Sequence, residues 1–321
     1  MKRSRWPAAS GLVNEWASLT TPDSTALLKG KMDELGKRWE DVAGGYRRLI
    51  KLETGPARVE AGMRFADACE RVGTPEAARG PLEELFHADQ SNETVRSRLR
   101  KLYEKLGLNR ELSNLLLADA NFAADDERKF ELLKEAGQLR LKSFESAATA
   151  IGPLTEALDL KPNDLLITLL LTDAYIAAGI NSDAVHLLQT AIDRYGDRRS
   201  REVAALQHRM ARAAGAEDPE IELHWLALAW ESYPQSGEVA SELAELAMEL
   251  NKHELALKAL RALAAMRTPA PISRPMALLK QAKIAQVQGD DRKAAFLAKK
   301  ALSEDPGLAE AQQFLEELGA G

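Results

Sequence analysis

Cysteine is almost absent from this sequence, since Cys69 is the only one among 321 residues. A single cysteine excludes an internal disulfide and a cysteine-based metal cluster, which is typical of proteins from a reducing compartment. Cys69 lies on the apolar stripe of a predicted helix, so we interpret it as a small buried core residue.

Long apolar runs are lacking as well. None approaches the roughly 18 residues that a membrane span needs. The basic N-terminal stretch is interrupted by Pro7, Asn14 and Glu15 before an apolar segment develops, so it does not resemble a signal peptide. We therefore expect a cytoplasmic protein that does not contact membranes.

Sequence motifs of catalysis are missing. We find no glycine-rich phosphate loop, no paired-histidine motif and no nucleophile elbow. Two of the five histidines, His208 and His224, lie on consecutive predicted helices, but no third ligand stands at a recognisable spacing from them. The sequence therefore predicts no catalytic residues, no metal site and no cofactor.

Charge is distributed unevenly along the chain. Residues 1–110 carry 20 basic and 16 acidic residues, whereas residues 111–321 carry 23 and 33. An acidic chain of this kind is not expected to bind nucleic acid. Its oppositely charged ends could support a salt-sensitive self-association.

A helical pattern recurs through most of the sequence. Residues 276–306 predict two amphipathic helices joined at Gly289, with small or apolar residues at helical spacing in each. Positions equivalent to Ala294 recur at alternating distances of 34 and 38 residues, and Pro162, Pro234 and Pro306 are 72 residues apart. The equivalent positions are Ala78, Leu112, Ala150, Ala184, Glu222, Ala256 and Ala294, and the predicted turns are at Gly73, Gly107, Gly179, Asn251 and Gly289.

This pattern resembles the tetratricopeptide repeat, and the alternating lengths resemble the paired repeats of long bacterial proteins of that family. The resemblance implies an all-α, right-handed α-solenoid, a superhelix of about eight helix–turn–helix units with capping helices at its ends. We assign residues 1–22 to an N-terminal cap, 23–306 to the solenoid and 307–321 to a C-terminal capping helix. The first unit, in residues 24–52, matches only loosely through Gly30, Val42, Tyr46 and Leu49.

Three positions depart from the repeat pattern. Arg100 and Gln138 stand where the first helix usually has a small residue, and Glu222 stands where the second helix usually has alanine. A shift of one residue would place Gly137 at the small position in place of Gln138.

The resemblance also implies that partners dock on the inner surface of the superhelix, which is lined by the first helix of each unit. We expect the stripe beside each core stripe to face this groove. The groove is predicted to be basic early in the chain, apolar in the middle, and acidic between residues 217 and 254, which include ten acidic residues and one lysine. The candidate groove residues are Met63, Arg64, Arg98, Lys101, Lys105, Lys134, Lys142, Leu166, Leu169, Asp173, Ile176, Gln207, Ser241 and Glu245.

Two of these stretches allow more than one interpretation. The segment LLITLLL, from Leu165, is apolar on nearly every side, so it is either a hydrophobic slot for a partner or a helix buried against its own chain. The early basic stripe, around Arg96, Arg98, Lys101 and Lys105, is either a solvated face or a site for an acidic peptide. In some related domains, asparagine on the first helices helps to hold the terminal carboxylate of a partner. Asparagine is missing from those faces here, so we do not expect this protein to bind a terminal carboxylate.

The sequence thus favours a non-catalytic scaffold or adaptor that binds a protein or peptide in its groove. The alternative is a regulatory or sensory module that binds a small ligand or a short signalling peptide.

Overall fold

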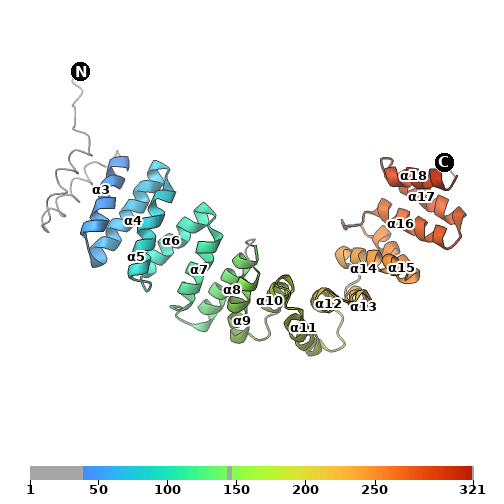
Figure 1. Ribbon diagram of the computed structural model, residues 1–321, viewed down its shortest axis with the longest axis horizontal. Helices are drawn as coiled ribbons and strands as arrows, with labels where there is room; N and C mark the ends of the chain where they lie inside the picture. The colour runs from blue at the N-terminus through green and yellow to red at the C-terminus, as the bar shows by residue number, and fades with distance from the viewer. Residues whose placement is uncertain (1–38, 143–146, 320–321) are drawn as a thin grey trace, which may run out of the picture. The chain divides into compact units, whose positions relative to one another are not determined.

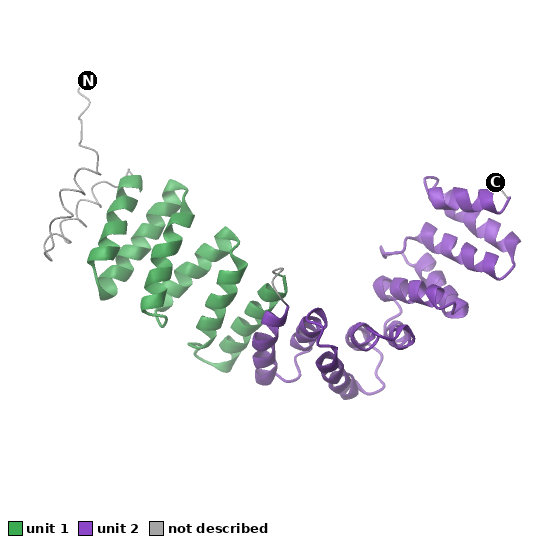
Figure 2. Ribbon diagram, viewed as in Figure 1, with its two compact units in different colours: residues 1–145 green, residues 146–321 purple. Residues whose placement is uncertain are grey.

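The computed structural model describes residues 39–142 and 147–319, and every regular element in these two ranges is helical. The chain divides into two compact units, Met1–Glu145 and Ser146–Gly321, which Figure 2 colours green and purple. The predicted N-terminal cap and Gly30 lie outside the described residues.

The first unit is a series of helices that pack in chain order (Figure 1). Helix α3 packs against α4, and a short 3₁₀ helix, η1, leads into α5. The helices are α3 (Trp39–Leu52), α4 (Gly55–Val72), η1 (Pro75–Ala78), α5 (Arg79–Ala88), α6 (Glu93–Leu106), α7 (Asn109–Ala120) and α8 (Asp126–Lys142).

The second unit continues the same arrangement up to the described end of the chain. Its helices are α9 (Ala148–Leu160), α10 (Leu165–Ala177), α11 (Asn181–Tyr195), α12 (Arg201–Ala214), α13 (Pro219–Ser232), α14 (Gly237–Glu249), α15 (His253–Ala265), α16 (Arg274–Val287), α17 (Asp291–Glu304) and α18 (Ala309–Glu317). In α18, Ala311, Phe314 and Leu315 are buried against the core that α16 and α17 form.

The first helices of the repeats are α4, α6, α8, α10, α12, α14 and α16, and the second helices follow them. Six of the seven positions that the sequence marks as equivalent are buried, and five of these are alanine, whose small side chain lets the two helices of a pair approach closely. The predicted fold of tetratricopeptide-like helix pairs is confirmed within each unit.

The connections between paired helices follow the sequence closely. All five predicted turn residues have a positive φ, from 56° at Asn251 to 86° at Gly73. This left-handed conformation ends a helix and favours glycine, with asparagine the next best choice. At the opposite ends, Asp164 caps α10 by accepting a hydrogen bond from the Ile167 N–H at 2.9 Å.

Two of the three exceptions to the repeat pattern have local explanations. Glu222 is only half-buried, and its backbone and Cβ lie where a side chain on Gly215 would have to be, so glycine at 215 makes room for the larger residue. Gly137 is buried whereas Gln138 is half-buried, which supports the register that places Gly137 in the core.

Helix α10 is apolar on most sides because it packs against three neighbours, α9, α11 and α12. Leu169 and Ile176 pack against the core that α11 and α12 form, so they belong to the packed interior more than to an open slot. Within this unit, burial against the chain therefore explains most of the LLITLLL pattern.

Candidate functional site

In the first unit, the predicted basic stripe is partly neutralised by ion pairs between consecutive first helices. Arg98 on α6 donates a hydrogen bond to Asp67 on α4 at 2.7 Å and lies 3.3 Å from Glu70. The Lys105 ammonium lies 3.9 Å from the same Glu70 carboxylate. Arg100 reaches forward to Glu135 on α8, with two contacts of 2.8 Å. These charges hold the repeats together and are less available to a partner.

Other cations of this stripe remain open. Arg64, Lys101 and Lys142 are exposed, and none of them has an ion pair within the described part of the chain. Lys134 pairs with Glu131 at 2.5 Å on its own helix, and Met63 beside Arg64 is half-buried. On α4 and α6, Arg64 and Lys101 are therefore exposed cations without an ion pair, and Glu60 and Glu93 are exposed anions without one among the described residues.

The first helices of the second unit are joined in the same way. The Arg209 guanidinium on α12 forms two parallel hydrogen bonds of 2.8 Å to Asp173 on α10, the strongest arrangement for this pair of groups. Nε2 of His208 lies 2.6 Å from Oε2 of Glu242 on α14. Lys280 on α16 donates to Glu245 at 3.2 Å. Two of the predicted groove residues, Asp173 and Glu245, thus link one repeat to the next.

Two predicted groove residues are not on the surface. Ser241 is 2% exposed, and its hydroxyl donates to the Gly237 carbonyl and accepts from the Ile272 N–H. Gln207 is 9% exposed, and its side-chain oxygen accepts a hydrogen bond from Ser232. Both residues are polar groups satisfied inside the helix packing, which sequence periodicity does not distinguish from a solvated face. We therefore remove them from the candidate surface.

Leu166 alone among the three apolar candidates on α10 is well exposed, at 47%. Leu169 and Ile176, the other two, are half-buried in the packing of α10 described above.

Acidic side chains form a stripe on α14. Glu238, Glu242, Glu245 and Glu249 follow one another at spacings of four, three and four residues, which places them on one face of the helix. Burial raises the pKa of Glu222 on the neighbouring α13, and the charges of Glu242 and Glu249 raise it further. The ionised Glu222 carboxylate is therefore held beside Glu242 and Glu249 at some cost in stability.

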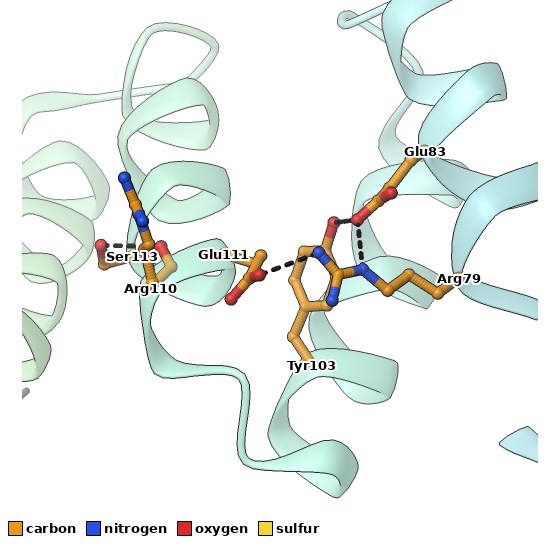
Figure 3. Close-up of polar contacts among 6 residues, drawn as sticks. All are labelled: Arg79, Glu83, Tyr103, Arg110, Glu111 and Ser113. Carbon is orange, nitrogen blue, oxygen red and sulfur yellow. Dashed lines mark hydrogen bonds and ion pairs between the residues drawn. The ribbon is translucent and has the colours of Figure 1, made fainter. Parts of the chain in front are cut away.

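Away from the first-helix surface, a network of polar residues joins α5, α6 and α7 (Figure 3). The buried Tyr103 hydroxyl donates to Glu83 at 2.9 Å, and Arg79 bridges Glu83 and Glu111 with contacts of 2.8 Å each. Burial raises the pKa of the Tyr103 phenol, and the hydrogen bond to Glu83 adds to this effect. Tyr103 is thereby kept protonated as a donor, which is a structural role.

A second polar contact, between α6 and α7, is more deeply buried. Arg96 forms an ion pair with Asp119, donates to the Gln90 carbonyl at 2.8 Å and lies 4.8 Å from the ring centre of Phe122. Burial raises the pKa of the Asp119 carboxyl, although the Arg96 charge opposes this. Arg96 therefore serves the packing of the repeat and not the exposed basic stripe.

The described residues contain no group of three or more histidine, cysteine, aspartate or glutamate side chains that could hold a metal ion. Over the same ranges, no helix combines the length and apolar character required to cross a membrane.

The apolar periodicity of the sequence does not reveal the pairing of the charges, although a signal for it exists. Partners such as Asp173 and Arg209, or Glu245 and Lys280, have opposite charges and stand 36 and 35 residues apart, which is about one repeat. Opposite charges at the repeat spacing on successive first helices predict such pairs.

No family model matches the chain, and no curated protein matches it. Among solved structures, Naa15/Naa10 bound to HypK-THB is similar with a TM-score of 0.57 and 16% identity, over 90% of this chain and 44% of that chain. A tetratricopeptide repeat protein from Parabacteroides merdae ATCC 43184 has a TM-score of 0.42 and 14% identity, over 85% and 98% of the two chains. MamA has a TM-score of 0.44 and 18% identity, over 56% of this chain and 94% of that chain. At these identities the likeness concerns the fold.

Proposed function

We propose that this protein is a non-catalytic interaction scaffold that binds a segment of a partner protein on the exposed faces of its first helices. The proposal rests on one observation, namely that some charged residues on these faces are in ion pairs whereas others are not. Arg98, Arg100 and Lys105 form ion pairs between repeats, whereas Arg64 and Lys101 are exposed and unpaired among the described residues.

The chemistry of this surface fits an acidic segment. Arginine and lysine side chains that have no carboxylate of their own attract carboxylates from a partner, and an arginine can bind one through two hydrogen bonds. A single exposed ion pair contributes little, roughly 0–1 kcal/mol, so several contacts must act together. The first helices of neighbouring repeats follow one another at regular intervals. An extended or helical segment of a partner could therefore contact several of them.

The test is affinity purification of the tagged full-length protein with quantitative mass spectrometry, comparing wild type with Lys101→Glu. We expect a partner recovered by wild type to be reduced at least about fivefold, because the substitution replaces an attraction by a repulsion. Lys299→Glu on α17 is the matched control, since Lys299 is also exposed and unpaired in the described residues but lies on a second helix.

Equal loss of the partner with Lys299→Glu would mean that overall charge, and not this surface, governs binding. Unchanged recovery with Lys101→Glu would remove the basic face of α6 from the proposal. Circular dichroism of both variants shows whether the fold is retained.

A further inference from the structure

The outer face of α17, the second helix of the last repeat, carries four basic residues around an exposed phenylalanine. Helix α17 packs against α16 and α18 through Ala294, Ala298 and Ala301, which are buried (Figure 1). At about 100° per residue, the side chains on the opposite side span about 120° of the helix surface, with the phenylalanine near the middle. This α17 face consists of Arg292, Lys293, Phe296, Lys299 and Lys300, all of which are exposed.

Among the described residues, no carboxylate pairs with the cations of the α17 face. Asp291 lies on the same helix but about 80° outside the face. Glu304, at the edge of the face in the last turn, pairs with Arg274 of α16 at 3.0 Å. Asp290 and Asp305, at the two ends of the helix, accept hydrogen bonds from backbone N–H groups. Four like charges over about two turns thus attract an anionic group.

Basic residues continue on α15, the second helix of the preceding repeat. Lys258 and Arg261 stand 38 residues before Phe296 and Lys299, and both are exposed without an ion pair in the described ranges. Glu254 is an exposed acidic residue one turn before Lys258 on the same face of α15. The outer side of α15 therefore adds a weaker positive charge to that of α17.

The α17 face is a local exception in an acidic unit. Residues 146–321 include 18 basic and 25 acidic residues. On α18, Glu316 and Glu317 are exposed, and Glu310 pairs with Lys283 at 3.3 Å. A nucleic acid or an anionic bilayer extends beyond one helix face and would be repelled by these carboxylates. A short acidic segment can contact the α17 face alone.

Phe296 is 66% exposed. A single exposed apolar side chain needs no explanation by itself. Here, however, Arg292 and Lys293 precede the ring by about one turn, and Lys299 and Lys300 follow it by about one turn. A segment whose carboxylates contact both pairs of cations must pass over the ring, and an apolar side chain at that point would cover it.

We propose that the α17 face docks a short acidic segment of a partner protein, in which an apolar side chain packs on Phe296 and carboxylates on both sides of it bind the two pairs of cations. Charge complementarity selects this occupant, since the face has four unpaired cations among the described residues while the rest of the unit repels larger polyanions. The site lies on a second helix of the second unit. It is distinct from the first-helix surface around Arg64 and Lys101 and does not depend on it.

The proposal is tested by photo-crosslinking to the full-length protein. The probe is a peptide with benzoylphenylalanine between two pairs of glutamates, and the comparison peptide has lysine in place of each glutamate. We expect the acidic peptide to cross-link to α17, as located by mass spectrometry, with at least about tenfold higher yield than the basic one. Lys299→Glu should lower this yield about fivefold, because one exposed attraction becomes a repulsion, and Phe296→Ala should lower it about threefold without changing the charge.

Arg198→Glu is the matched control. Arg198 lies between α11 and α12, is exposed and has no ion pair within the part of the chain that the structure describes. Its substitution changes the net charge as much as Lys299→Glu does, and it should alter the yield on α17 less than about twofold. Far-UV circular dichroism and the melting temperature should stay at wild-type values in all three variants, since the side chains are in solvent.

Absence of cross-links from α17, equal yields from the two peptides, or equal effects of Lys299→Glu and Arg198→Glu would overturn the proposal. Cross-links confined to α4 and α6 would also overturn it, while leaving the function proposed above intact. Sedimentation of the wild type with phosphatidylserine vesicles, abolished by Lys299→Glu, would instead identify a bilayer as the occupant. A wild-type dimer that Lys299→Glu dissociates in sedimentation velocity would identify a second copy of this chain, and either result would overturn the proposal.

Discussion

At the scale of single residues, Glu222 shows how the chain tolerates a departure from its own repeat. The equivalent position is buried alanine or leucine in the other described repeats, and Glu222 fits because Gly215 leaves room for its backbone and Cβ. Its carboxylate is half-buried and near Glu242 and Glu249, and both effects raise its pKa in the folded protein above the ordinary value of 4.5.

The raised pKa makes the stability of the protein depend on pH. A carboxyl whose pKa is higher in the folded state contributes stability below its ordinary pKa, and this contribution is lost as the pH rises through the folded value. At pH 7 the ionised Glu222 is therefore a cost. We expect Glu222→Gln to raise the melting temperature by about 1–3 °C at pH 7 and by less near pH 4.

Thermal unfolding monitored by circular dichroism at both pH values measures this difference. A gain at pH 4 as large as that at pH 7 would show that burial of the ionised carboxylate is not the cause. Glu316→Gln, at an exposed carboxylate on α18, serves as the control and should change little at either pH.

At the scale of the helix, α10 contains both exposed and packed apolar residues, which its sequence alone does not distinguish. Leu166 and Leu169 are one helical turn apart, yet Leu166 is 47% exposed whereas Leu169 packs against the α11 and α12 core. A charge at 169 must be buried or must disrupt the packing, and either outcome is unfavourable.

We expect Leu169→Asp to lower the free energy of unfolding by about 2 kcal/mol, while Leu166→Asp stays within about 0.5 kcal/mol of wild type. Urea denaturation of the two variants compares them directly. Similar stabilities would mean that Leu169 is a surface residue after all, and the hydrophobic-slot interpretation of α10 would return.

The helices and turns could be predicted from the sequence because their signals are local. A glycine or asparagine that must adopt a positive φ, and a small residue repeated where two helices touch, are each visible in one short stretch. The surface was predicted less well, because exposure depends on neighbours from other repeats. Ser241 and Gln207 have the spacing of surface residues but are buried by contacts that only the packed array supplies.

At the scale of the whole molecule, the helices contact mainly their neighbours in the chain. Stability in such an array is close to a sum of local terms and nearest-neighbour terms. A defect should therefore loosen the repeat in which it occurs and the adjacent ones, and should leave distant repeats protected.

Arg96→Ala provides the test, because it leaves Asp119 half-buried without its partner. Loss of one member of a buried ion pair costs about 3–5 kcal/mol, so amide hydrogen exchange in α6 and α7 should accelerate by at least about 100-fold. Exchange in α15 to α17, measured by mass spectrometry on the same sample, should remain at the wild-type rate. Equal acceleration along the chain would indicate one cooperative unit in place of a linear array.

The ion pairs between first helices also make the repeats non-interchangeable. Arg209 on α12 stands between Asp173 on α10 and the carboxylate stripe of α14 in the order of the chain. If recombination removed α12 and α13, the helices would still have a matching apolar face, but Asp173 would then meet Glu242 and Glu245 and like charges would oppose each other. The charges thus favour this order of the repeats, so loss of one repeat would carry an electrostatic cost that the alanine pattern does not reveal.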